Sequence, residues 1–270
     1  MKRGLAANRG EAAALVEAGR VLVGGAVAEK ASRQVGPAEP LVVSVPGARF
    51  ASRGGEKLDA ALDRFAVDVN GKEALDAGAS TGGFTDCLLQ RGAVAVVAVD
   101  VGYGQLLPRL RADPRVKVLE RANVRRLSPA DLGGRRFAVV VADLSFISLM
   151  TVASSLVSLA QPEAELVVLV KPQFEAGRAV VSKGKGVVRD PHVWAGVLCD
   201  VAGAFQAAGA TVSGGMASPL LGAEGNVEFF LHLKTGSGTL ASPLDIDGLA
   251  EAAVSGVRGA GMKTSRKWRP

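Results

Sequence analysis

The chain has 270 residues, of which 48% are hydrophobic and 21% charged, a balance typical of a folded protein with one full-sized α/β domain and a smaller unit beside it. Its formal net charge of +6 suits an anionic partner such as RNA or a membrane surface, but the charge alone does not separate the two. Two histidines are too few for the usual His-based metal sites, so we expect no metal. The two cysteines lie far apart, the apolar runs are short and there is no signal-peptide pattern. These features favour a cytoplasmic protein without a membrane span.

Residues 1–47 differ from the rest of the chain and are predicted to form a small α+β module. A helix is expected over residues 10–19, with apolar residues on one face. A hairpin with a glycine turn is expected over residues 20–27, and a further strand over residues 41–45. So small a unit has little core, and we expect it to lean on a neighbour or a ligand. Residues 48–52 are the expected linker.

From residue 53 to residue 236, strand patterns alternate with helix patterns. Strands are predicted over residues 73–77, 94–100, 116–119, 137–143, 165–170, 211–216 and 227–233, and helices over residues 56–65, 82–91, 105–112, 147–159 and 192–208. The fourth and fifth strands are nearly continuous apolar runs, which is typical of strands buried on both faces of a parallel sheet. The pattern predicts an α/β fold, a Rossmann-like seven-stranded sheet with helices on both faces. Residues 237–270 are expected to add a helix over 242–257 and a basic tail.

A glycine-rich loop joins the first predicted strand to the helix that follows it. The loop reads Asp76-Ala-Gly-Ala-Ser-Thr-Gly-Gly-Phe-Thr, a pattern typical of a nucleotide-type cofactor site because its glycines allow close backbone approach. The candidate cofactor-binding residues of the loop are Asp76, Gly78, Ser80, Gly82, Gly83 and Phe84. The alternative is that the glycines only make a tight turn.

Acidic residues favour S-adenosylmethionine over a dinucleotide as the cofactor. Asp76 stands before the first glycine, where it would oppose a pyrophosphate but attract the ammonium or sulfonium of S-adenosylmethionine. Asp100 ends the second strand and is placed to hold ribose hydroxyls, a feature of both cofactor classes. Asn123 follows the third strand and is a candidate for the adenine edge.

Two further charged residues follow buried strands. Asp143 ends the fourth strand and Lys171 follows the fifth, and the carboxyl ends of strands line the active crevice of open α/β sheets. Both side chains are therefore expected to face the cofactor loop. Taken alone, the two positions are equally compatible with a structural salt bridge.

Six ordered blocks along nearly the whole chain resemble the TlyA (haemolysin A) family of RNA methyltransferases, which have an FtsJ-like catalytic domain. The blocks are Arg53-Gly-Gly-Glu-Lys57-Leu, the loop from Asp76 to Thr85, Val99-Asp-Val-Gly-Tyr-Gly-Gln, Asp143-Leu-Ser-Phe-Ile-Ser, Val170-Lys-Pro-Gln-Phe-Glu and Gly225-Asn-Val-Glu228-Phe-Phe. The resemblance implies a catalytic tetrad of Lys57, Asp143, Lys171 and Glu228. It also implies S-adenosylmethionine as cofactor and the ribose 2′-hydroxyl of a cytidine in ribosomal RNA as the methylated group.

Elementary chemistry is consistent with such a tetrad. A ribose hydroxyl is a poor nucleophile until a base accepts its proton, and a lysine can do so only in its amine form. We assign Lys171 as the base and Lys57 as the residue that tunes it or binds substrate, while Asp143 and Glu228 orient the lysines and the attacking oxygen. Without the resemblance, Glu228 is better explained as a solvated acid on an exposed strand edge.

RNA contacts are expected from both ends of the chain and from one long loop. Residues 4–30 resemble the α-L RNA-binding motif, although the helix that usually precedes Arg3-Gly-Leu is largely missing, so either the module is trimmed or the true start lies upstream. The basic segment over residues 173–189 is expected to be a mobile substrate clamp or an ordinary flexible loop. Candidate RNA-binding residues are Lys2, Arg3, Arg9, Arg20, Lys30, Arg33, Arg53, Arg178, Lys183 and Lys185.

Three other functions compete with the methyltransferase interpretation. A membrane-active haemolysin needs an inserting element, and the apolar runs are better explained as sheet strands. A ribosomal assembly factor without enzymatic activity would use the same domains, but would not need the tetrad. A nicotinamide-dependent oxidoreductase is disfavoured because the loop departs from G-x-G-x-x-G.

Overall fold

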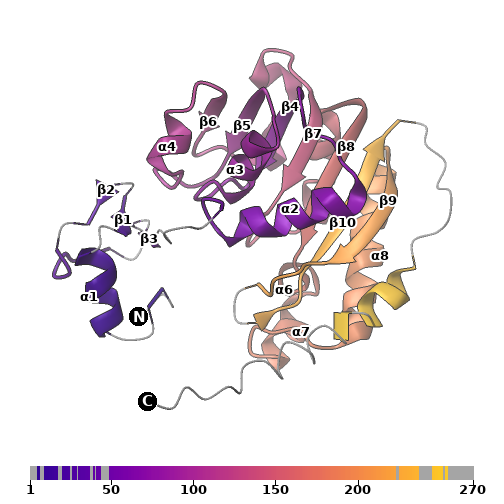
Figure 1. The fold of residues 1–270 in the computed structure, drawn as a ribbon. Helices are drawn as coiled ribbons and strands as arrows, with labels where there is room; N and C mark the ends of the chain where they lie inside the picture. Colours follow the sequence, from indigo (N-terminus) through magenta and orange to yellow (C-terminus); the bar gives the residue numbers. More distant parts are fainter. Residues whose placement is uncertain are drawn as a thin grey trace.

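The computed structural model describes residues 5–6, 9–17, 20–24, 26–28, 30–36, 39, 41–43, 49–222, 225–236, 245–251 and 253–254. A seven-stranded sheet in the order β6-β5-β4-β7-β8-β10-β9 forms the centre of the larger domain (Figure 1). Its strands are β4 (Glu73–Ala77), β5 (Ala95–Val99), β6 (Val116–Leu119), β7 (Phe137–Ala142), β8 (Ala160–Val170), β9 (Ala210–Ala217) and β10 (Phe229–Thr235). The first five run parallel, and β10 pairs antiparallel with both β8 and β9. The predicted α/β fold class is confirmed.

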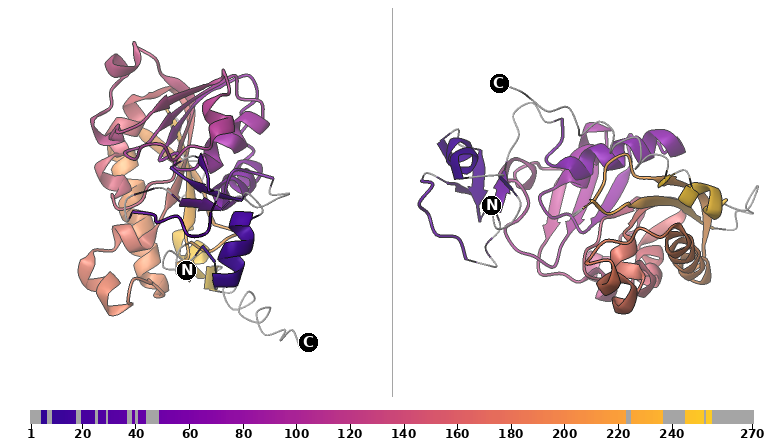
Figure 2. Two further views of the ribbon diagram at one scale, coloured as in Figure 1. Left: turned by 90° about the vertical axis from the view of Figure 1, so that its left-hand side faces the viewer. Right: turned by 90° about the horizontal axis from the view of Figure 1, so that it is seen from below.

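Helices cover both faces of the sheet, as two views at right angles show (Figure 2). Alternate residues of the buried strands divide the core, since Val139 and Val141 of β7 join one apolar cluster while Val140 and Ala142 join the other. The first cluster includes side chains of α2 (Arg53–Phe65), α3 (Gly83–Gln90) and α4 (Pro108–Arg111). The second includes side chains of α5 (Ala153–Ser158) and α8 (Pro191–Ala207).

Helix α2 lies along β10, and the contacting stretches of the two elements match in length. Its residues Lys57, Ala61 and Phe65 recur at helical spacing, and Phe65 stacks on His232 with ring centroids 5.1 Å apart. Eight helical residues rise about 12 Å, close to the roughly 13 Å spanned by four strand residues. The helix can therefore contact both ends of the stretch from Glu228, the residue before β10, to His232.

Some predicted helix bounds are wrong, for local reasons. Helix α2 begins at Arg53 rather than Glu56, because the Ser52 hydroxyl accepts a hydrogen bond from the Gly54 amide and caps it. The helix predicted over residues 147–159 is split into η3 (Leu149–Thr151) and α5, and that over 105–112 is reduced to α4, where Pro108 takes the first helical turn.

The predicted clamp loop over residues 173–189 also differs from expectation, because it contains two short helices. These are α6 (Pro172–Glu175) and α7 (Arg178–Lys183). The remaining single-turn elements are η1 (Val124–Arg126) and η2 (Pro129–Leu132). Of the predicted C-terminal helix, residues 246–251 and 253–254 are helical, and the basic tail lies outside the described residues.

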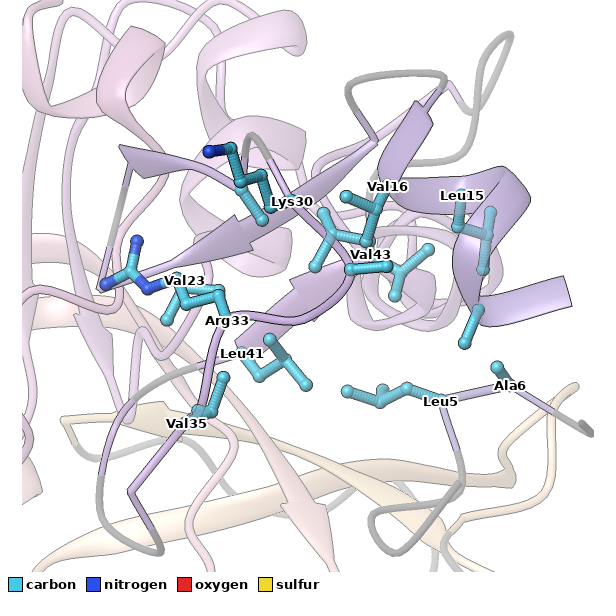
Figure 3. A pocket seen from close by; sticks show the side chains of 14 residues that line it. Leu5, Ala6, Leu15, Val16, Val23, Lys30, Arg33, Val35, Leu41 and Val43 are labelled. Atoms are coloured by element: carbon cyan, nitrogen blue, oxygen red, sulfur yellow. The ribbon is translucent and has the colours of Figure 1, made fainter. Parts of the chain in front are cut away.

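The N-terminal module consists of α1 (Arg9–Glu17) and a three-stranded antiparallel sheet in the order β2-β1-β3. Its strands are β1 (Val21–Val23), β2 (Ala26–Val27) and β3 (Leu41–Val43), so the predicted hairpin is confirmed. Only Val21, Val23 and Ala28 are buried hydrophobics among its described residues. They border an apolar cavity of about 150 Å³, with Lys30 and Arg33 at its edge (Figure 3). The core is small, as expected for so short a unit.

Candidate active site

A cavity of about 670 Å³ opens at the carboxyl ends of the central strands. The loops after β4, β5, β6 and β7 line it with Gly78, Ser80, Val99, Asp100, Val101, Gly102, Gln105, Ala122, Asn123, Val124, Asp143, Leu144, Ser145, Phe146 and Ile147. Five residues expected at the cofactor are in this lining: Gly78, Ser80, Asp100, Asn123 and Asp143. The position agrees with the rule that ligands of open α/β sheets bind outside the carboxyl ends of the strands.

The Asp100 carboxylate is held in place by two backbone amides at the cavity wall. Ser80 N donates to its Oδ2 at 2.8 Å, and Gly102 N donates to its Oδ1 at 2.7 Å. A carboxylate offers about four lone-pair sites, so each oxygen keeps acceptor capacity for a ligand hydroxyl. Asn123 is oriented similarly, because its amide oxygen accepts from Arg125 N at 3.0 Å, which leaves the amide nitrogen as a donor.

Glycine at position 78 is a steric requirement at the floor of the cavity. Its φ of 91° lies in the left-handed region, and a Cβ there would stand 2.3 Å from the Asp143 carbonyl oxygen. Gly78 therefore lets the cofactor loop pass directly against the end of β7, which carries Asp143.

Gly82, Gly83 and Phe84 lie outside the lining and make packing contacts. A Cβ on Gly82 would meet the Leu110 side chain at 2.3 Å, and one on Gly83 would meet Ser52 Oγ at 2.2 Å. Phe84 is buried and stacks on Phe230, with ring centroids 6.2 Å apart. These three residues fix the start of α3 against α2 and α4.

Asp76 is fully buried and is also outside the lining. Thr85 Oγ1 donates to its Oδ2 at 2.6 Å, whereas its Oδ1 has no hydrogen-bond partner. The pKa of Asp76 is raised to about 7, chiefly by burial, while the Thr85 hydrogen bond opposes the rise and the nearby Asp143 and Asp100 add to it. Its carboxyl group is therefore poised between neutral and ionised forms near neutral pH, beneath the cavity rather than in its wall.

Lys171 and Asp143 form an ion pair beside the cavity. Their contact is close but not an aligned hydrogen bond, and Asp143 Oδ1 has no hydrogen-bond partner. Ser145 Oγ accepts a hydrogen bond from Lys171 Nζ at 3.2 Å, so a second group orients the amine. The Lys171 side chain is 12% exposed, which leaves the amine shielded but not sealed. The predicted salt bridge is thus present, and it lies at the site rather than away from it.

Lys57 and Glu228 form the second ion pair, with Nζ and Oε2 2.5 Å apart. Both residues are buried, so the interpretation of Glu228 as an exposed edge acid is wrong. Strand β10 lies between β8 and β9, and α2 covers this end of it. Gly222 packs against the same carboxylate, because a Cβ there would stand 2.0 Å from Glu228 Oε1.

The strand register relates the two ion pairs. Val170 of β8 is paired with Phe229 of β10. Lys171 follows Val170, and Glu228 precedes Phe229. Because β8 and β10 are antiparallel, both residues lie at the same end of two adjacent strands. The fold thus brings the four predicted tetrad residues into two amine–carboxylate pairs at the carboxyl edge of β7 and β8.

The segment that follows Lys171 is anchored at both ends. At its start, Glu175 accepts hydrogen bonds from Ser148 Oγ at 2.5 Å and Leu149 N at 2.8 Å, and burial raises the pKa of its carboxyl group. At its end, Asn226 Oδ1 accepts from Val188 N, and its Nδ2 donates to Gly186 O, both at 3.0 Å. We call residues 172–188 the strap, because it begins beside one ion pair and its end is held by Asn226, two residues from Glu228.

The predicted RNA-binding residues are spread over the molecule. Arg9, Lys30 and Lys185 are exposed, Arg33 pairs with Glu39 at 2.8 Å, and Arg20 is half-buried. Arg53 donates to the Leu221 carbonyl oxygen at 3.0 Å, close to Gly222. Lys2, Arg3 and the side chains of Arg178 and Lys183 lie outside the described part of the chain.

Sequence reasoning missed several residues of the cavity. Ser145 and Gln105 contribute polar atoms, and Phe146 stands at the cavity lip with 91% of its surface exposed. All three lie inside blocks used to recognise the family. Their spacing carries no signal of its own, because loop residues have no periodicity to reveal which way they face.

Comparisons with known proteins agree with this geometry. Residues 50–235 match the model of the FtsJ-like methyltransferase family, and residues 2–40 match that of the S4 domain. Over 256 residues the chain is 49% identical to the 16S/23S rRNA (cytidine-2'-O)-methyltransferase TlyA of Mycobacterium tuberculosis (strain CDC 1551 / Oshkosh), covering 94% of this chain and 95% of that protein. The chain belongs to the TlyA family of FtsJ-like methyltransferases.

Relatives within the TlyA family carry two kinds of name. Hemolysin A of Brachyspira hyodysenteriae is 37% identical over 229 residues, covering 85% of this chain and 95% of that protein. The solved structure of a protein described as a hemolysin, from Streptococcus thermophilus, is 37% identical with a TM-score of 0.78 and covers 97% of this chain and 95% of that one. Within the described residues of this TlyA-family chain, no helix has the length and apolar character needed to cross a membrane.

Proposed function

We propose that this TlyA-family protein transfers a methyl group from S-adenosylmethionine to the ribose 2′-hydroxyl of a cytidine in ribosomal RNA. One observation carries the proposal: the Lys171–Asp143 ion pair borders a cavity that Asp143 itself lines together with the glycine loop. The Asp143 carboxylate thus pairs with the proposed base and also lines the proposed cofactor site. The named activity of the Mycobacterium tuberculosis relative supports ribosomal RNA and cytidine as the substrate, and such a substrate implies action in the cytoplasm.

The lining fits S-adenosylmethionine. A volume of about 670 Å³ lies within the range of roughly 300–1,000 Å³ that small-molecule and cofactor sites span. Asp100, fixed by two amides, offers acceptors to ribose hydroxyls, and the Asn123 amide nitrogen is a donor for an adenine edge. Gly78 and Ser80 present backbone rather than bulky side chains. When bound, S-adenosylmethionine would supply a methyl group from a positively charged sulfur, and the carbon–sulfur bond would break so that the sulfur leaves as a neutral thioether.

Lys171 is the proposed base. In its amine form, Nζ accepts the proton of the ribose hydroxyl as the oxygen forms its new bond to carbon, and the resulting ammonium is stabilised by Asp143. Ser145 holds the amine from a second direction, so Nζ keeps one orientation while the proton moves. Positioning of this kind supplies a large share of the rate in reactions between two bound groups.

Lys57 and Glu228 are proposed to form a second wall of the site, against which the substrate ribose is held. Their charges satisfy each other in a buried setting, and Gly222 covers the Glu228 carboxylate. A pair so enclosed is a rigid wall, since moving either charge leaves the other buried and unpaired. This arrangement suits residues that set where the attacking oxygen lies.

The decisive experiment combines methyl transfer with mapping. Purified protein, labelled S-adenosylmethionine and isolated ribosomal subunits are incubated together, and the modified nucleotide is identified by mass spectrometry of nuclease fragments. We expect 2′-O-methylcytidine from the wild type and none from Lys171→Ala, which should retain cofactor binding. Lys234→Ala is the matched control, because Lys234 also pairs with a carboxylate, Glu165 at 2.9 Å, but at the other end of β10.

Other outcomes would select other functions. Undiminished methylation by Lys171→Ala would remove that residue from the mechanism. Tight binding to subunits with no methylation by the wild type would favour a ribosomal assembly factor. Dye release from liposomes by the purified protein without cofactor would favour a membrane-active protein.

A further inference from the structure

Two loops lie side by side at one rim of the cofactor cavity. The loop after β5 supplies Val101 and Gly102 to the lining, and the segment after β6 supplies residues 122–124. They are joined by backbone hydrogen bonds, because Arg121 N donates to Gly102 O and Ala122 N donates to Asp100 O, both at 3.0 Å. Side chains of the residues next to these lining positions therefore lie along this one rim of the cavity.

Two such side chains stack on each other in solvent. Tyr103 is 64% exposed, and the Arg121 guanidinium lies 4.6 Å from the centre of its ring. Arg121 has a φ of 56°, a left-handed conformation that glycine or asparagine adopts more easily. An arginine kept in this conformation at a site rim points to a use for its side chain.

Arg125 and Arg126 extend the same rim. Both are exposed on η1, whose backbone is held by Asn123 and by the Ser155 hydroxyl, which donates to the Arg125 carbonyl oxygen at 2.9 Å. Within the described residues, no acidic side chain forms an ion pair with Arg121, Arg125 or Arg126. Other arginines of this domain differ in this respect, since each has a carboxylate partner: Arg109 with Asp86, Arg111 with Glu120, Arg115 with Asp113 and Arg135 with Glu73.

We define Tyr103, Arg121, Arg125 and Arg126 as the rim surface and propose that it binds the RNA strand flanking the methylated nucleotide. The arginines contact phosphates, and the Tyr103 ring with its stacked guanidinium receives a neighbouring base. Uncompensated arginines suit phosphates, and an exposed aromatic ring suits the flat face of an unpaired base. The proposal deepens the proposed function, on which it rests, by adding a contact surface on the catalytic domain itself, apart from the N-terminal module and the strap.

The test compares two variants that lose the same charge. Arg125→Gln/Arg126→Gln removes two arginines without acidic partners, and Arg115→Gln/Arg135→Gln removes two paired ones. With ribosomal subunits as methyl acceptor, we expect the first variant to raise KM at least tenfold while kcat stays within twofold at saturation. The slope of log affinity against log salt should become shallower by roughly 0.7–0.9 for each phosphate that the variant no longer neutralises. The control should stay within twofold of the wild type in KM.

Tyr103 separates stacking from charge. Tyr103→Ala should raise KM at least fivefold, whereas Tyr103→Phe, which keeps the ring, should leave it within twofold. Thermal unfolding and affinity for S-adenosylmethionine should be unchanged in every variant, which excludes misfolding as the cause. Binding of the same variants to a protein-free ribosomal RNA transcript is also measured. Arg125→Gln/Arg126→Gln and Tyr103→Ala should raise the apparent Kd for the transcript as well.

Three results would overturn the proposal: unchanged KM and salt slope in Arg125→Gln/Arg126→Gln, an equal effect in the paired-arginine control, or a weakening with intact subunits that is absent with the transcript. The last result would assign the rim surface to a ribosomal protein. If the wild type methylates nothing, the proposed function has failed, and equilibrium binding of the same variants to subunits still tests the surface independently.

Discussion

Lys57 and Glu228 are 171 residues apart in the chain, yet Lys57 Nζ lies 2.5 Å from Glu228 Oε2. Both side chains are buried, so each charge is out of contact with most of the solvent and depends on the other. Such a pair contributes little net stability compared with apolar residues, but removing one partner strands the other charge. The pair therefore allows the fold and the activity to be tested separately.

Breaking this pair should cost stability in a non-additive way. We expect Lys57→Met or Glu228→Met alone to lower the free energy of unfolding by about 3 kcal/mol, because each leaves an uncompensated buried charge. The double variant leaves none and should recover most of the loss, while remaining inactive in methyl transfer. Urea denaturation of the four proteins measures the coupling.

The matched control is Lys234→Met, which breaks the half-exposed pair with Glu165 and should change stability by less than about 1 kcal/mol. Additive losses in the Lys57/Glu228 cycle would show that the two charges act independently. Methyl transfer restored in the double variant would remove both residues from the proposed catalytic machinery.

Asp76 should make the protein less stable as pH rises. Its pKa is raised from 3.8 to about 7 in the folded state, so the folded protein binds a proton more tightly than the unfolded chain between these values. Stability is then greatest below pH 4 as far as this group is concerned, falls as pH rises toward 7, and levels off above it. The full difference corresponds to about 4 kcal/mol at 1.36 kcal/mol per pKa unit.

Asp76→Asn tests this linkage, because the amide keeps the shape of the side chain but cannot ionise. The gain in stability of the variant over the wild type should be roughly 2–3 kcal/mol larger at pH 8 than at pH 5, as measured by urea denaturation. Asp131→Asn serves as control, since Asp131 is exposed and its pKa is lowered by Ser128, the opposite direction. A gain from Asp76→Asn that does not change with pH would mean that Asp76 ionises freely in the folded protein.

The strand pattern of the sheet was predictable because burial imposes it. Residues 73–77 and 116–119 were predicted to the residue. Strand β7, which is buried on both faces, stood out as an apolar run and was predicted to within one residue. Helix bounds failed where a single side chain decides them. Ser52 starts α2 three residues early, and the helix predicted from residue 147 begins only at Leu149, where Ser148 caps η3 and Glu175, a residue far along the chain, accepts from the Leu149 amide.

The candidate site was predictable from motifs but not from periodicity. Alternation places Glu228, Phe230 and His232 on one face of β10, but it does not say that β10 is an inner strand or that α2 covers this face. Both facts depend on strand order, to which residues far apart in sequence contribute. Likewise, Gly82, Gly83 and Phe84 resemble cofactor contacts in the sequence, while the fold uses them to pack helices.

Loosening the strap should weaken RNA binding without weakening cofactor binding. Asn226→Asp keeps the size of the side chain and an acceptor for Val188 N, but replaces the donor to Gly186 O with an oxygen. We expect a stability loss of about 1–3 kcal/mol and at least a fivefold rise in KM for ribosomal subunits. Affinity for S-adenosylmethionine, measured by calorimetry, should remain within twofold.

Glu175→Gln provides a comparison at the other end of the strap, where one of the two acceptor oxygens is retained. It should shift KM in the same direction by a smaller factor. A fall in kcat with unchanged KM in both variants would show that the strap acts on the chemical step and not on substrate capture.

Gly78→Ala should close the cofactor cavity from below. The new Cβ would lie 2.3 Å from the Asp143 carbonyl oxygen, and the backbone φ of 91° disfavours any L side chain. The ends of β4 and β7 would have to separate at the point where Asp143 faces Lys171. We expect affinity for S-adenosylmethionine to fall at least tenfold in titration calorimetry, with methyl transfer lost in proportion.

Gly71→Ala is the matched control, because its φ of 72° carries the same backbone penalty of roughly 1–2 kcal/mol while nothing lies within 4 Å of the new methyl group. If both variants bound the cofactor equally well, the close approach of Gly78 to Asp143 would be a packing detail, and the cofactor would have to bind elsewhere.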